Sequence, residues 1–326
     1  MAYRITAVPV SEENYAEKMD TVVMPYLEAH GGDAYFESFD GNKIHYEHYS
    51  VESPEGVIVL VHGFTESVVK FREMSYNFLM MGFNVFAIEN RGHGLSYRIN
   101  PDDPETVTIH SFDDYVKDLD CFIKTVVLPA NEGLTPYLYA HSMGGAIGVQ
   151  YLQTHADVFP KAVLTAPMIM PQTAGLPSFA VKALINPFIW TGKGDKMAFI
   201  YHGFNPNYSF ENSNDTSRVR FDYYHKIRCA TRHLQTSCAS YNWVSEAIKV
   251  SKRNLDPARC AKIKTEILLC QPEVDKSVVS SAEDDFIKLV KNGRLVKFPA
   301  SKHEIYASGD ETLLSYLTEI EKFLKG

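Results

Sequence analysis

The chain reads Ala140-His141-Ser142-Met143-Gly144-Gly145 at the point where an apolar run expected to form a strand, 137–140, meets an expected helix, 144–154. A serine on such a strand-to-helix turn has strained backbone angles that hold its hydroxyl beyond the edge of the sheet. Small neighbouring residues let the strand and the helix approach closely, although Ala140 stands where such turns usually have glycine. We therefore predict that Ser142 is a nucleophile; the alternative is a serine in an ordinary glycine-rich turn.

Strands and helices alternate on both sides of this turn. The expected strands are 57–61, 84–88, 137–140, 162–166, 265–270 and 294–298, and the expected helices are 15–28, 71–81, 111–127, 144–154, 282–291 and 311–324. A hairpin is expected over 34–48, around Asp40-Gly41-Asn42. Continuous apolar runs suit central parallel strands, so the alternation predicts an α/β fold with a mostly parallel sheet and helices on both faces.

The alternation stops after Pro167. From residue 168 to residue 250 helical patches are separated by proline and glycine, and no run suits a central strand. We therefore expect three parts, namely a first part of the core at 1–167, an inserted helical cap or lid at 168–250, and a second part of the core at 251–326.

A serine hydroxyl needs a positioned base to take its proton, and in this architecture the order along the chain is serine, acid, histidine. Of the histidines weighed beyond the helix 144–154, only His303 follows an expected core strand; His202, His225 and His233 fall within the expected cap. Active-site residues of open α/β sheets collect at the carboxyl ends of strands, which favours His303 over a surface histidine. Asp275 follows the preceding core strand and is the expected acid, with Glu273 as the alternative.

The tetrahedral intermediate of acyl transfer needs an oxyanion hole, typically made of two backbone N–H groups. We expect one from Met143, which follows the nucleophile, and the second from Phe64 in the loop after the strand 57–61. Gly63 would allow the close approach of that loop.

The composition excludes several other classes of protein. A net charge of -8 argues against general nucleic-acid binding. The five cysteines form no C-x-x-C pair, and the chain has no Walker sequence, dinucleotide fingerprint or paired-histidine zinc motif, so we expect neither a metal nor an organic cofactor. The charged N-terminal segment lacks the apolar core of a signal peptide, and no apolar stretch is long enough to span a membrane, so we expect a cytoplasmic protein.

These motifs resemble those of the α/β-hydrolase superfamily, and within it the branch of monoglyceride lipases and bacterial lysophospholipases, also labelled serine aminopeptidase-like. The resemblance is carried by Val59-Leu60-Val61-His62-Gly63-Phe64, Arg91-Gly92-His93-Gly94-Leu95-Ser96, His141-Ser142-Met143-Gly144-Gly145, and the pair Asp275 and His303. It covers most of the chain outside the expected cap. Glu89 stands where the family usually has aspartate, in a turn that is structural in the family.

The resemblance implies hydrolysis of a carboxylic ester of a single-chain lipid, of the lysophospholipase or monoacylglycerol lipase kind, through an acyl-enzyme on Ser142. Two alternatives use the same fold: an aminopeptidase-like or acyltransferase activity on the same triad, and a binding protein that has lost catalysis. An aminopeptidase would hold the substrate amine with carboxylates of the cap. Glu211 and Glu246 are available for this, but they form no clear acidic pair.

Two features of the expected cap bear on the substrate. Its aromatic residues could line a tunnel for an acyl chain, or they could form the core of the cap itself; they are Phe188, Trp190, Phe199, Tyr201, Phe204, Tyr208, Phe210 and Trp243. The segment 218–233 is locally basic and either faces a lipid phosphate or anionic membrane, or is a solvated face. Peripheral contact with the inner face of a membrane through the cap needs no anchor sequence and stays open.

Overall fold

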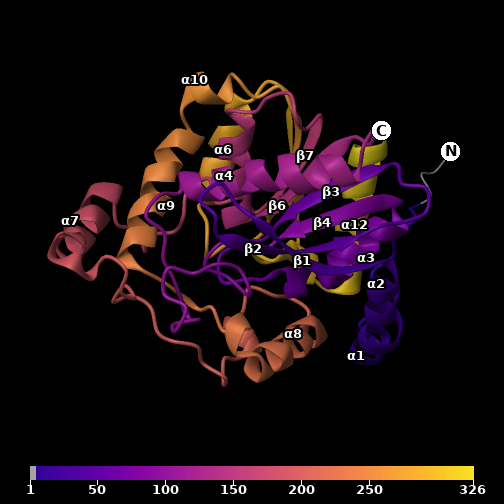
Figure 1. Cartoon of the computed structure of the whole chain (residues 1–326), viewed down its shortest axis with the longest axis horizontal. Helices are drawn as coiled ribbons and strands as arrows, with labels where there is room; N and C mark the ends of the chain where they lie inside the picture. The colour runs from indigo at the N-terminus through magenta and orange to yellow at the C-terminus, as the bar shows by residue number, and fades with distance from the viewer. Residues whose placement is uncertain (1–4) are drawn as a thin grey trace.

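The structure, a computed structural model, describes residues 5–326 and is built around a twisted sheet of eight strands (Figure 1). In spatial order the strands are β1 (Gly31–Glu37), β2 (Lys43–Tyr49), β4 (Phe83–Ile88), β3 (Gly56–Val61), β6 (Pro136–His141), β7 (Lys161–Thr165), β9 (Glu266–Pro272) and β10 (Gly293–Phe298). The pairs β1–β2 and β2–β4 are antiparallel, and every other neighbouring pair is parallel. The predicted mostly parallel α/β sheet and the predicted hairpin are therefore confirmed.

Helices cover both faces of this sheet. One face carries α4 (Asp113–Phe122), α6 (Met143–Leu152), α9 (Tyr241–Asn254) and α11 (Ser280–Leu289), and the other carries α3 (Arg72–Met80) and α12 (Asp310–Lys325). Strand β3 shows why its apolar run is continuous: Val57, Val59 and Val61 face the first layer, while Ile58 and Leu60 face the second. A strand that is covered on both faces has no polar side to expose.

The predicted N-terminal helix is interrupted. It consists of α1 (Tyr15–Lys18), a π-helical turn η1 (Met19–Val23) and α2 (Met24–His30), which follow one another directly. A π-helical turn, η3 (Ile123–Val127), likewise continues α4 into the short helix α5 (Leu128–Ala130). Hydrophobic periodicity does not distinguish such single wider turns from the α-helix around them.

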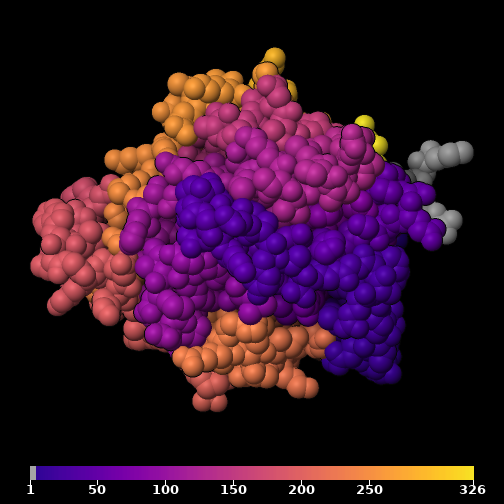
Figure 2. Space-filling view, in the orientation of Figure 1, coloured from indigo at the N-terminus to yellow at the C-terminus, as the bar shows by residue number. Residues whose placement is uncertain are grey.

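Between β7 and α9 the chain leaves the sheet. This segment contains α7 (Ser178–Phe188), η4 (Ile189–Lys193), η5 (Phe210–Asn212), α8 (Arg218–Ala230), η6 (Arg232–Leu234) and β8 (Cys238–Ala239). Strand β8 pairs only with the two-residue strand β5 (Thr106–Val107), outside the main sheet. Figures 1 and 2 show α7 at the left edge of the molecule and α8 below the sheet.

Helix α9 begins within the span 168–250 that the sequence assigns to a cap, yet it packs on α6 of the core. Trp243, Ala247 and Val250 belong to the same buried cluster as the sheet. The exact boundaries of the inserted segment therefore stay a prediction. Remaining elements of the core are η2 (Val68–Phe71), α10 (Pro257–Cys260) and η7 (Ile305–Ala307).

Among residues 5–326, none of the helices combines the length and the apolar composition that crossing a bilayer requires.

Candidate active site

Ser142 occupies the turn between β6 and α6 with a positive φ of 51° and a ψ of -115°. The neighbouring strand supports this strained backbone, because the N–H of Ser142 donates to the carbonyl of Thr165 at 3.1 Å. The carbonyl of Ser142 accepts the N–H of Met168 at 2.8 Å. Non-glycine residues adopt such angles only when their surroundings enforce them, and they do so mainly at functional sites.

The glycines after Ser142 are required by close packing. A Cβ atom on Gly144 would lie 2.2 Å from the carbonyl oxygen of Val61 at the end of β3. A Cβ atom on Gly148 would lie 3.5 Å from the Cβ of Ala140, which is an ordinary contact. The restriction at Gly148 comes instead from Leu138 of β6, whose Cδ2 atom would lie 2.9 Å from an added Cβ atom.

The structure brings Ser142, His303 and Asp275 together from three separate segments. The Nε2 atom of His303 lies 2.8 Å from the Oγ of Ser142, and its Nδ1 atom lies 2.7 Å from Oδ2 of Asp275. His303 is 4% exposed and Ser142 is 8% exposed. Glu273, the alternative acid, instead accepts the N–H of Ala300 at 2.8 Å.

Asp275 is held as a carboxylate. Its second oxygen accepts the N–H groups of Ser277 at 2.7 Å and Val278 at 2.9 Å. Burial alone would raise the pKa of Asp275, but the hydrogen bond and charge of His303, with these two N–H groups, lower it below the usual value. An ionised acceptor on Nδ1 fixes the tautomer in which Nε2 of His303 is free to accept the serine proton.

Phe64 and Met143 both belong to segments next to Ser142, since Met143 follows it directly in the chain. Phe64 follows Gly63, where an added Cβ atom would stand 3.0 Å from the Cβ of Ser142, so the loop passes directly beside the nucleophile. Within residues 5–326, neither the N–H of Phe64 nor that of Met143 donates a hydrogen bond. Both groups are therefore available to a ligand oxygen, as an oxyanion hole requires.

A buried glutamate that the sequence did not predict supports this loop. Glu66 accepts the N–H of Gly63 at 2.6 Å, contacts Nδ1 of His141 at 2.9 Å, and accepts the hydroxyl of Tyr306. Burial would raise the pKa of Glu66, but His141, the nearby Lys70 and Tyr306 together hold it well below the usual value. A glutamate in a loop is normally exposed to solvent, so nothing in the sequence indicated that Glu66 is buried.

An apolar cavity of about 670 Å³ opens beside the acid of the three residues. It lies between α7, α9 and the loop after β7, and it reaches Asp275. Phe199, Tyr201 and Trp243 line it, and the Trp243 ring lies 4.1 Å from that of Phe64. The other aromatic residues of the predicted cap are divided: Phe188 stacks on Tyr241 within that segment, whereas Trp190 is exposed. Some of the aromatic residues of the expected cap therefore line a cavity, and others pack against one another or are exposed.

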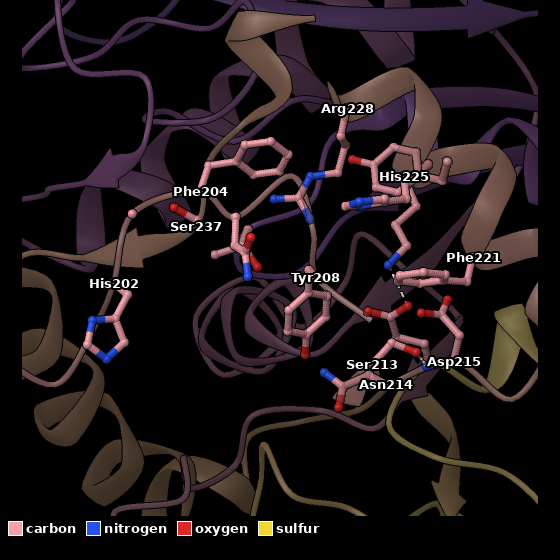
Figure 3. Close-up of a pocket in the computed structure, with 16 residues that line it drawn as sticks. His202, Phe204, Tyr208, Ser213, Asn214, Asp215, Phe221, His225, Arg228 and Ser237 are labelled. Atoms are coloured by element: carbon pink, nitrogen blue, oxygen red, sulfur yellow. Dashed lines mark hydrogen bonds and ion pairs between the residues drawn. The ribbon is translucent and has the colours of Figure 1, made fainter. Parts of the chain in front are cut away.

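Figure 3 shows a second, polar pocket of about 400 Å³. Its walls include Thr65, which follows Phe64, and Glu304, which follows His303. Helix α8 and the loop of Phe204 and Tyr208 complete it.

The basic segment 218–233 has no single role. Arg218 is exposed and pairs with Glu211 and Asp222. Arg220 is buried and pairs with Glu73 of α3 and Asp310 of α12, so it anchors α8 to the core and does not face a lipid. Of these basic residues, Arg228 lines the polar pocket.

Comparisons with known proteins show the family of the chain. Residues 52–310 match the family model Hydrolase_4, described as serine aminopeptidase, S33. Lysophospholipase L2 of Escherichia coli strain K12 is 29% identical over 296 residues, which cover 85% of this chain and 83% of that protein. Monoacylglycerol lipase of Mycolicibacterium smegmatis is 28% identical over 137 residues, or 41% of this chain and 46% of that protein.

Solved structures share the fold. A soluble variant of monoglyceride lipase from Saccharomyces cerevisiae, in complex with a substrate analog, superposes with a TM-score of 0.71 at 17% identity, covering 90% of this chain and 94% of that chain. A thermostable carboxyl esterase from Bacillus coagulans gives a TM-score of 0.73 at 17% identity, covering 91% and 98%. The chain belongs to the serine aminopeptidase, S33 family and has the α/β-hydrolase fold.

Proposed function

We propose that the protein hydrolyses carboxylic esters of single-chain lipids, with Ser142 as the nucleophile, His303 as general base and then acid, and Asp275 as the orienting carboxylate. The observation that carries the proposal is the 2.8 Å contact between Ser142 Oγ and His303 Nε2. It is supported by an apolar cavity of about 670 Å³ whose lining includes Asp275. Relatives named lysophospholipase L2 and monoacylglycerol lipase support the same class of substrate.

In the proposed reaction, Ser142 Oγ attacks the ester carbonyl while His303 Nε2 takes its proton. The carbonyl oxygen becomes an oxyanion, which accepts the N–H groups of Phe64 and Met143. When the tetrahedral intermediate collapses, the C–O bond to the alcohol breaks and His303 gives its proton to the leaving alkoxide. Water then attacks the acyl-serine by the same route, releasing the fatty acid and restoring Ser142.

The apolar cavity is suited to the acyl chain. Its lining is mostly aliphatic and aromatic, and apolar pockets with few polar groups bind such ligands well. Neither Glu211 nor Glu246 lines the apolar cavity or the polar pocket. Glu211 is exposed and pairs with Arg218, while Glu246 accepts the N–H of Phe112, so the carboxylates considered for an aminopeptidase are engaged elsewhere.

We also propose that the protein reaches its substrate by peripheral contact between the α7 region and a lipid surface. Phe179 is 77% exposed and Trp190 is 79% exposed. Leu184, Phe199 and Ile200 are exposed as well, and these three also line the apolar cavity. An exposed apolar surface that is continuous with the cavity would let an acyl chain pass from a bilayer into the site without crossing water.

A rate comparison tests the substrate class. Monoacylglycerols, lysophospholipids, short aryl esters and aminoacyl anilides would be assayed with the wild type and with Ser142→Ala. We expect the single-chain lipid esters to give the highest kcat/KM and the variant to give no turnover of any ester. Faster cleavage of the anilides would instead support the aminopeptidase-like alternative.

A further inference from the structure

The polar pocket beside His303 differs in chemistry from the apolar cavity. It contains two cationic and two anionic side chains, Lys70, Arg228, Asp215 and Glu304, so its lining has both signs of charge. In Figure 3, Arg228 enters the pocket at the top of the view and Asp215 at its lower right. Such a pocket is matched by a ligand that carries both charges at separate atoms.

Asp215 is the least compensated of these groups. It is 4% exposed, and among residues 5–326 no lysine, arginine or histidine nitrogen lies within the 4.0 Å of an ion pair with it. The nearby Lys70 is instead paired with Glu304 and Glu66. A buried carboxyl group without a cation is costly when ionised, so a bound cation would stabilise it.

The charge state of Asp215 agrees with this. Burial raises the pKa of Asp215 well above its usual value, and the neighbouring negative charge of Glu304 raises it further. A ligand cation beside this carboxyl would favour its ionised form and so offset the rise in its pKa. The aromatic rings of Tyr208 and Phe221, 6.4 Å apart, line the same pocket and add faces that attract cations.

Arg228 presents the opposite charge. Its guanidinium donates to the carbonyls of Leu234 at 3.1 Å and Thr236 at 2.7 Å, and no carboxylate of the described chain pairs with it. It lies 5.9 Å from the centre of the Tyr224 ring, whose other neighbour is Lys70 at 5.3 Å. An arginine held by neutral carbonyls keeps its full charge for an anionic ligand, and phosphate suits its planar fork.

The position of the pocket fixes which part of an ester would enter it. Trp243 and Asp275 belong to the apolar cavity, whereas Thr65 and Glu304 belong to the polar pocket. The polar pocket is thus bounded by the residues that follow Phe64 and His303, whereas the apolar cavity is bounded by Trp243, which packs on Phe64, and by Asp275, which pairs with His303. If the carbonyl of the ester lies between them and the acyl chain occupies the cavity, the alcohol part points to the polar pocket.

We propose that the polar pocket binds a phosphate group that carries an alkylammonium tail, with the phosphate against Arg228 and the ammonium against Asp215 and the rings of Tyr208 and Phe221. This inference rests on the proposed function and narrows it. Lysophospholipids with a zwitterionic headgroup are then better substrates than those whose headgroup is only anionic, and both are better than monoacylglycerols.

The first test compares kcat/KM for four esters with the same acyl chain: lysophosphatidylcholine, lysophosphatidylethanolamine, lysophosphatidylglycerol and monoacylglycerol. For lysophosphatidylcholine and lysophosphatidylethanolamine, Asp215→Asn should reduce kcat/KM relative to that of lysophosphatidylglycerol about tenfold, because only the contact with the ammonium group is lost. Arg228→Gln should reduce kcat/KM for all three lysophospholipids, relative to that for monoacylglycerol, by about the same factor. The control variants Asp222→Asn and Arg218→Gln remove exposed charges from α8, the helix that carries Arg228. Both should leave the relative kcat/KM values unchanged.

The second test measures binding without hydrolysis, so that it is independent of catalysis. An octyl-ether analogue of lysophosphatidylcholine, which has no ester to cleave, would be titrated into the wild-type protein by calorimetry, beside octyl glycerol and octyl glycerophosphate. We expect the zwitterionic analogue to bind at least about tenfold more tightly than the other two.

Equal binding of the three ether analogues would overturn the headgroup proposal, even if either variant folds poorly. The proposal would also be overturned if neither Asp215→Asn nor Arg228→Gln changed the relative kcat/KM values of the four esters. Failure of the proposed function looks different: no ester, including a short aryl ester, would be turned over, while the ether analogue would still reveal whether the polar pocket recognises the headgroup.

Discussion

The Nδ1 atom of His141 lies 2.9 Å from the Oε2 atom of Glu66, and the same oxygen accepts the N–H of Gly63 at 2.6 Å. His141 precedes Ser142, and its other ring nitrogen lies 3.3 Å from the carbonyl oxygen of His303. One buried carboxylate therefore connects the turn of the nucleophile, the loop of Phe64 and the loop of the catalytic histidine. The positions of all three depend on it.

Replacing Glu66 tests this dependence. Glu66→Gln keeps the shape of the side chain but replaces one acceptor oxygen with an N–H₂ group, which would face the donors of Gly63 and Tyr306. We therefore expect the Gly63–Phe64 loop to shift. Loss of alignment of one oxyanion donor should lower kcat about 10- to 100-fold with little change in KM, since the loop acts mainly on the transition state. Steady-state kinetics on a short aryl ester measure this, and circular dichroism checks the fold. The exposed control Glu52→Gln should match the wild type, and an unchanged kcat for Glu66→Gln would show that the network has no positioning role.

The choice of acid is tested by a pair of substitutions. Asp275→Asn removes the charge that fixes the His303 tautomer, and we expect kcat to fall roughly 10³- to 10⁴-fold. Glu273→Gln changes the alternative carboxylate, which contacts only the N–H of Ala300, and should leave kcat within about twofold of the wild type. If the larger loss followed Glu273→Gln, our assignment of the acid would be wrong.

The exposed apolar residues near α7 predict membrane association. Phe179→Ser together with Trp190→Ser removes two exposed aromatic side chains, and we expect the fraction of protein that sediments with lipid vesicles to fall at least about fivefold. Turnover of a water-soluble aryl ester should be retained, since neither residue contacts Ser142, His303 or Asp275. Leu128→Ser, at an exposed apolar residue of α5, is the control. Undiminished sedimentation of the double variant would place any membrane contact on another surface.

A buried acid in α11 predicts how stability depends on pH. Burial raises the pKa of Glu283 to about 9, and among the described residues its Oε1 atom has no hydrogen-bond partner. Because the folded pKa lies above the unfolded one, the contribution of this group to stability is complete below about pH 4.5. It is lost as the pH rises towards 9, at up to about 1.4 kcal/mol per pH unit.

Glu283→Gln should remove that dependence. Chemical denaturation of the wild type and the variant at pH 6, 7.5 and 9 would show a difference in unfolding free energy that grows with pH in favour of the variant. Asp285→Asn, at an exposed residue on the same helix, should give a constant difference. A gap between wild type and Glu283→Gln that stayed constant over this range would mean that Glu283 is already ionised in the folded protein.

Most of the fold was predictable because its signals are local. The buried run of β3 and the Ser142 turn each reflect neighbours within a few residues, and the chain order then indicated Asp275 and His303. The role of Glu66 was not predictable, since His141 and Tyr306 reach it from distant segments. The pocket of Asp215 and Glu304 was not predictable for the same reason, since these residues are 89 positions apart in the sequence. They meet only because the loop before α8 packs on the loop of His303, where the N–H of Glu304 donates to the carbonyl of Asn214 at 3.2 Å.

The reactivity of Ser142 towards a fluorophosphonate probe tests the central proposal most directly, because the probe forms an adduct only with a serine that an adjacent base activates. We expect mass spectrometry of the digested wild-type protein to locate one stoichiometric adduct on the peptide that contains Ser142, and no adduct in Ser142→Ala. A folded wild-type protein that stays unlabelled, or that is labelled equally when Ser142 is replaced, would contradict the proposal.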